Sequence, residues 1–88
     1  MHLIVTGTVQ GVGYRWFVQK TGERLGLGGW VKNCPDGTVE AEVEGDQDAI
    51  DTFLTSLRHD HRHARVDQII TERLPAGTPK LSSFEIKL

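Results

Sequence analysis

Hydrophobic and polar residues alternate most regularly between Thr38 and Glu44. Val39, Ala41 and Val43 occupy every second position, and glutamates occupy the positions between them. Successive side chains of a strand point to opposite faces of a sheet, so one face of this segment would be buried and the other solvated. The pattern predicts a strand over 38–44, with its glutamates on the solvent-exposed face of the sheet.

Four other segments are rich in β-branched or alternating apolar residues and are also predicted as strands. They are Leu3–Thr8, Gly29–Asn33, Ala64–Leu74 and Phe84–Leu88. The segment between the predicted strands 29–33 and 38–44 contains Pro35-Asp36-Gly37. Proline fixes φ, aspartate can form a hydrogen bond to its own backbone, and glycine accepts a positive φ. This turn predicts a hairpin. A loop is predicted over 75–79.

Two segments show the spacing of amphipathic helices. Ile50, Phe53, Leu54 and Leu57 follow the i, i+3, i+4, i+7 rule, and Asp46 stands where an N-cap would lie. The other helix is predicted over 16–25. Its central Gly22 costs about 1 kcal/mol against alanine, which is tolerable if the helix lies close to a sheet at that point.

The order of these segments is strand, helix, strand, strand, helix, strand, with a short extra strand at the end. This is the order of the split β-α-β, ferredoxin-like fold of the α+β class, in which two helices cover one face of an antiparallel sheet. We find no repeat, linker or low-complexity stretch, and 88 residues suit one modest core. The chain is therefore predicted to form a single domain over 1–88.

Composition narrows the function classes. The net charge is −2, so no basic field favours nucleic acid. No apolar stretch approaches the ~20 residues of a membrane helix, and the N-terminus lacks the features of a signal peptide. Cys34 is the only cysteine and cannot form an internal disulfide. These features predict a cytoplasmic protein that binds neither nucleic acid nor membrane, and nothing demands more than a monomer.

The segment 9–15, with the sequence VQGVGYR, carries the clearest chemistry. It lies between a predicted strand and a predicted helix. Glycines let a backbone approach a ligand closely, and loop N–H groups next to a helix N-terminus attract anions. Arg15 adds a planar, forked donor set that matches two phosphate oxygens. This loop predicts a phosphate site without a group that titrates near neutral pH.

In combination and order, two segments closely resemble the acylphosphatase family. They are 7–15, with the sequence GTVQGVGYR, and 28–40, with the sequence GGWVKNCPDGTVE. The family pattern is a Val-Gln-Gly-Val-x-aromatic-Arg loop, followed by Gly-Trp-Val-x-Asn-x-x-Asp-Gly-x-Val-Glu. The resemblance extends to 25–27, 53–57, 64–66 and 84–86, and so covers nearly the whole chain. The departure at His59-Asp60-His61-Arg62-His63, where the family usually has a Gly-Pro-Pro-like turn, leaves both segments intact.

The resemblance implies hydrolysis of acyl phosphates to a carboxylate and inorganic phosphate, with no cofactor, no metal and no covalent intermediate. Arg15 would bind the phosphate and Asn33 would orient the attacking water. The remaining donors would be backbone N–H groups of Gln10, Gly11, Val12, Gly13 and Tyr14. The chemistry agrees, because a carboxylate leaves without protonation and needs no general acid. Alkyl phosphates, with poorer leaving groups, should react several orders of magnitude more slowly.

Other interpretations stay open at this point. The same loop would serve a non-catalytic module that binds phosphate or an anionic metabolite. Asn33 stands before a turn and could be an Asx-turn residue. The rings of Tyr14 and Trp30 are treated as structural. His59, His61 and His63 would share one face of a strand and could bind a metal, although a polar connection is the simpler interpretation.

Overall fold

The computed structural model describes residues 1–75 and 81–88. Within these ranges the elements are β1 (His2–Thr8), α1 (Tyr14–Arg24), β2 (Gly28–Asn33), β3 (Val39–Glu44), α2 (Gln47–His59), β4 (Arg65–Glu72) and β5 (Phe84–Lys87). Their types and order match the prediction, and the boundaries differ by up to two residues. Part of the loop predicted over 75–79 lies outside the described residues. No helix in the described ranges has the length and apolar character required to cross a bilayer.

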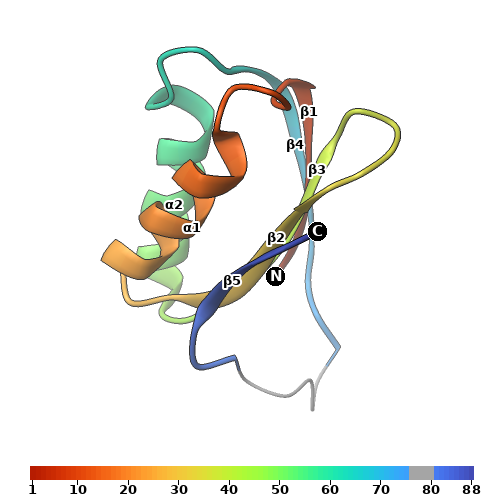
Figure 1. The fold of residues 1–88 in the computed structure, drawn as a ribbon. Coiled ribbons are helices and arrows are strands. Elements are labelled where there is room, and N and C mark those ends of the chain that lie inside the picture. The colour runs from red at the N-terminus through yellow and green to blue at the C-terminus, as the bar shows by residue number, and fades with distance from the viewer. Residues whose placement is uncertain (76–80) are drawn as a thin grey trace.

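The strands form one five-stranded sheet in the order β4-β1-β3-β2-β5. Both helices pack against the same face of this sheet and leave the opposite face bare (Figure 1). Because β1 and β3 lie together at the centre, the loop that leaves β1 and the hairpin that joins β2 to β3 meet at one end of the sheet. The predicted ferredoxin-like α+β fold is confirmed.

The predicted antiparallel sheet is confirmed for the first four strands, and the predicted extra C-terminal strand joins its edge in the parallel direction. β1 to β4 pair antiparallel, whereas β5 pairs parallel with β2, placing Phe84 opposite Gly29 and Ile86 opposite Val31. β4 lies at one edge of the sheet and β5 at the other, where β5 runs in the same direction as β2 (Figure 1).

The core lies between the sheet and the helices. Val39, Ala41 and Val43 are at most 1% exposed, and the glutamates between them are half-buried, so the alternation predicted for this strand is confirmed. From α2, Phe53 and Leu57 enter the same core. Asp46 is the residue at the α2 N-cap, as expected, but its side chain makes no capping hydrogen bond.

Helix α1 lies so close to the sheet that Gly22 is required for space. A Cβ on Gly22 would come within 2.4 Å of the Phe84 ring, which is itself almost fully buried in β5. This close approach explains a glycine in the middle of a helix, where the intrinsic propensity is poor. The contact fixes α1 against β5, and so fixes the position of the first turn of α1, where Arg15 lies.

The turn between β2 and β3 follows the predicted mechanism. The Asp36 carboxylate accepts hydrogen bonds from the backbone N–H and the hydroxyl of Thr38, at 3.0 and 2.6 Å, and these bonds lower the pKa of Asp36. Gly37 has a φ of +91°. The hairpin is thereby rigid on the side that faces the loop after β1.

Candidate active site

A cavity of about 210 Å³ opens where the loop after β1, the first turn of α1, the end of β2 and strand β5 meet. It is lined by Val9, Gln10, Gly11, Gly13, Tyr14, Arg15, Trp16, Asn33 and Ile86. The structure therefore brings together the residues predicted for the phosphate site from two distant segments. Val12 is the exception, because its side chain packs against the core instead of lining the cavity.

A larger hollow of about 620 Å³ lies at the other end of the sheet. It is lined by the beginning of β2, the end of β3 and the residues 73–75 and 81–82 that border the undescribed segment. None of the residues predicted for phosphate binding reaches it. The smaller cavity is therefore the candidate site.

The floor of the site is the glycine loop. Gly11 and Gly13 have φ values of +77° and +76°, and Gly13 is the N-cap of α1. Left-handed residues of this kind turn successive N–H groups toward one point, which creates an anion-binding concavity. In the part of the chain that the structure describes, no side-chain hydrogen bond caps this end of the helix. This end of α1 therefore presents free backbone donors and the positive end of the helix dipole.

Arg15 lies in that first turn and is half-buried. Its Nη1 donates a hydrogen bond of 3.3 Å to the backbone carbonyl of Lys87 in β5. No carboxylate in the described part of the chain forms an ion pair with Arg15. A cation at the positive end of a helix is unfavourable unless an anion offsets it. The arrangement thus favours an anionic ligand between Arg15 and the loop.

Asn33 is the last residue of β2 and faces the same cavity. Its side-chain Oδ1 is buried and has no hydrogen-bond partner among the described residues. The Asx-turn interpretation is wrong, because Pro35, two residues on, has no N–H to donate. A buried amide oxygen without a partner is costly, typically by about 1–3 kcal/mol, and is best satisfied by a donor such as water.

Gln10 joins the two halves of the site, which the sequence did not reveal. Its side-chain Nε2 donates hydrogen bonds of 2.8 Å to the carbonyl oxygens of Cys34 and Thr38. These two residues flank the Pro35-Asp36-Gly37 turn, and Cys34 directly follows Asn33 in the sequence. The loop that would hold a phosphate is therefore bonded to the segment that carries the amide.

The Tyr14 ring is structural, as predicted. Its hydroxyl donates a 2.8 Å hydrogen bond to the Leu57 carbonyl, and burial raises the pKa of the phenol.

The histidine segment after α2 lies beside this ring. The Tyr14 ring contacts His61, whose Nδ1 accepts hydrogen bonds from the backbone N–H groups of His63 and Ala64. The histidines do not share a strand face, because His59 ends α2 and the other two lie in the following loop.

Comparisons with known proteins agree with this geometry. A family model described as acylphosphatase matches residues 1–86. A curated acylphosphatase of Alcanivorax borkumensis is 46% identical over 97% of this chain and 95% of its own length. The crystal structure of an acylphosphatase from Bacillus subtilis superposes with a TM-score of 0.87 at 37% identity, covering 99% of this chain and 96% of that one.

An acylphosphatase structure from Coxiella burnetii gives a TM-score of 0.90 at 35% identity, over 98% of this chain and 88% of that one. The family match thus covers both segments that build the cavity, the loop with Arg15 and the strand with Asn33. On the combined grounds of sequence, fold and site, the chain belongs to the acylphosphatase family.

Proposed function

We propose that this protein hydrolyses acyl phosphates by direct attack of water on the phosphoryl group. Family membership supports the activity, and the cavity supports the division of roles. Arg15 and the N–H groups of the glycine loop bind the phosphoryl oxygens, and the Asn33 amide oxygen holds the water. The observation that carries the proposal is the buried Oδ1 of Asn33, which lies in the same cavity as Arg15. Among residues 1–75 and 81–88 this oxygen has no hydrogen-bond partner and Arg15 has no ion pair.

The reaction balances with these groups alone. The water oxygen forms a bond to phosphorus, the bond from phosphorus to the acyl oxygen breaks, and its electron pair leaves with the carboxylate. The proton lost by the water ends on the phosphate product. A carboxylate is the base of an acid with a pKa near ~4, so it departs unprotonated at neutral pH. Catalysis then consists of positioning and charge stabilisation, which Arg15 and the backbone donors supply.

The test is steady-state hydrolysis of benzoyl phosphate by wild type and Asn33→Ala, with EDTA present. We expect turnover by wild type that falls about 10²- to 10³-fold in the variant, because a preorganised group is lost. Inhibition by inorganic phosphate should persist, because Asn33 does not bind the phosphate. Gln68→Ala, which removes an exposed amide on β4, is the matched control and should leave both quantities unchanged.

The rival function is a non-catalytic module that binds phosphate or an anionic metabolite. It would use Arg15 and the loop in the same way but has no use for Asn33. A folded wild-type protein that binds phosphate and does not hydrolyse benzoyl phosphate would establish this rival and reject hydrolysis.

We also propose that the enzyme needs no metal and acts as a cytoplasmic monomer on a small molecule, without nucleic acid or membrane. The charges required at the phosphoryl group are present on the protein, and one chain supplies every wall of the cavity. Activity that is unaffected by EDTA, together with a monomer mass by light scattering, is the expected result.

A further inference from the structure

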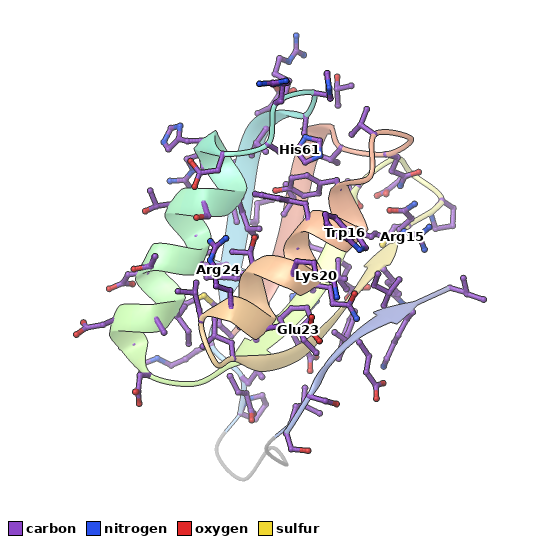
Figure 2. The ribbon with its side chains drawn as sticks, turned by 60° about the vertical axis from the view of Figure 1, so that its left-hand side comes forward. Arg15, Trp16, Lys20, Glu23, Arg24 and His61 are labelled. Atoms are coloured by element: carbon purple, nitrogen blue, oxygen red, sulfur yellow. The ribbon has the colours of Figure 1, made fainter. Side chains whose placement is uncertain are left out.

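Trp16 is an apolar side chain left in solvent beside the phosphate site. It is 61% exposed, and the other large exposed apolar residues of the described chain are Ile70, Leu81 and Leu88. Among these four, only Trp16 lines the candidate active site. Figure 2 shows it next to Arg15 on α1, with Lys20 one turn further along the helix. Its position, more than its exposure alone, calls for an explanation.

The mechanism fixes where the acyl group must lie. In an in-line displacement the leaving group departs on the side of phosphorus opposite the attacking water. The loop and Arg15 hold the phosphoryl oxygens, and Asn33 holds the water. The acyl group therefore extends away from Asn33, toward the mouth of the cavity.

Few of the apolar side chains that line the cavity are accessible to that acyl group. Of the apolar side chains that line the cavity, Val9 and Tyr14 are each only 1% exposed and already packed in the core. Ile86, on β5, is half-buried. Trp16 alone offers a broad accessible face.

The positive charge of Lys20 beside the Trp16 indole is balanced by a carboxylate, that of Glu23. Lys20 Nζ lies 6.0 Å from the centroid of the Trp16 ring and also pairs with the Glu23 carboxylate at 3.2 Å. Because the cation already has a partner on its own helix, this side of the mouth does not select for a charged acyl group. An indole favours a planar, apolar group, since aromatic pairs gain attraction beyond the area they bury.

We infer that the Trp16 side chain forms the wall of the site that binds the acyl group. It selects acyl phosphates with an aromatic acyl group, such as benzoyl phosphate, over those with a short aliphatic one, such as acetyl phosphate. The inference rests on the proposed function. Trp16 does not touch the reacting phosphorus or the water, so it determines specificity without contributing to the chemical step.

The experiment compares kcat and KM for benzoyl phosphate and acetyl phosphate in wild type, Trp16→Ala and Trp16→Phe. Trp16→Ala should lower kcat/KM for benzoyl phosphate about tenfold, mainly by raising KM, and change acetyl phosphate by less than about twofold. Trp16→Phe should restore most of the loss. Inhibition by inorganic phosphate should be the same in all three proteins.

Ile70→Ala is the matched control, because it removes an apolar side chain of similar exposure on β4, away from the cavity. It should change neither substrate. An equal loss on both substrates in Trp16→Ala, or no loss on either, would overturn the inference. Absence of turnover by wild type on both substrates would instead reject the proposed function, so the two failures are distinguishable.

Discussion

The Nε2 atom of Gln10 lies 2.8 Å from the carbonyl oxygen of Cys34, and this hydrogen bond joins the glycine loop to the strand end that carries Asn33. A second bond of equal length reaches the Thr38 carbonyl across the same turn. The relative position of Arg15 and Asn33 therefore depends on a side chain that reaches from one segment to the other.

Replacing Gln10 by alanine should lower kcat more than it weakens phosphate binding. The backbone N–H groups of the loop remain, but the segment after Asn33 loses two hydrogen bonds that fix it against the loop. We expect kcat to fall about tenfold or more, since small misplacements of a positioning group are costly. The phosphate inhibition constant should change by less than about threefold.

The control is Gln19→Ala, which removes another amide that donates to a backbone carbonyl, that of Phe84. Gln10→Ala, which removes two hydrogen bonds, should lose about 2 kcal/mol of unfolding free energy and Gln19→Ala about 1 kcal/mol, and only the Gln10 variant should lose kcat. An equal effect on kcat in the two variants would contradict the positioning role.

Arg15→Lys should remove most of the activity while preserving the charge. Lysine offers a point charge on a flexible stem and cannot bond two phosphate oxygens in one plane. We expect kcat/KM for benzoyl phosphate to fall about 100-fold, with weaker inhibition by phosphate. Arg24→Lys makes the same change at the far end of α1 and should have no effect. Kinetics near wild type for Arg15→Lys would mean that forked binding is unimportant.

Stability should depend on pH through Glu40, on the bare face of the sheet. Its Oε2 lies 2.6 Å from His2 Nε2, and its Oε1 lies 3.5 Å from Lys32 Nζ. The hydrogen bond from His2, followed by the charge of Lys32, lowers the pKa of this carboxyl below its ordinary value of 4.5, although partial burial acts in the opposite direction. A lowered pKa in the folded state stabilises the fold above the unfolded value, and this stabilisation disappears as the pH falls through the folded value.

Glu40→Gln should therefore lower the unfolding free energy near pH 6, by at most about 1 kcal/mol because the pair is partly exposed. The difference from wild type should shrink as the pH falls below the ordinary value of 4.5 and through the lowered pKa that Glu40 has in the folded state. Urea titrations at several pH values measure it. Glu42→Gln, on the same strand and without an ion pair within the described residues, should show a smaller difference at pH 6.

Gly22→Ala should destabilise the protein, although alanine is the better helix former by about 1 kcal/mol. The added methyl would meet the Phe84 ring, and overpacking of this kind costs about 1–3 kcal/mol. Combining it with Phe84→Leu tests the cause, because the double variant should lose less than the sum of the two single variants. Stability is measured by thermal and urea unfolding. Purely additive losses would mean that the destabilisation by Gly22→Ala does not come from contact with the Phe84 ring.

Periodicity and turn chemistry predicted the elements and the fold because those signals are carried by residue type. The glycine loop and Arg15 were identified for the same reason, whereas Asn33 was singled out through the resemblance to the acylphosphatase family. The role of the Gln10 side chain was missed because its acceptors are backbone carbonyls, which every residue possesses. The direction of β5 was missed because alternation in Phe84–Lys87 shows a strand but not its partner. Helix α1 begins at Tyr14, two residues before the prediction, because Gly13 caps it without a side-chain signal.

The parallel pairing of β5 with β2 also sets the order in which the site can be assembled. Gly29 pairs with Phe84, so this contact closes a loop of 84 − 29 = 55 residues. Hairpin contacts between β2 and β3 close far shorter loops and carry a smaller entropic cost. During refolding Asn33 would reach its place in the sheet early, and the Lys87 carbonyl that accepts a hydrogen bond from Arg15 would arrive later, together with the Ile86 wall of the cavity. Recovery of anion binding at the site is thereby tied to a contact that closes a far longer loop than the hairpin between β2 and β3 does.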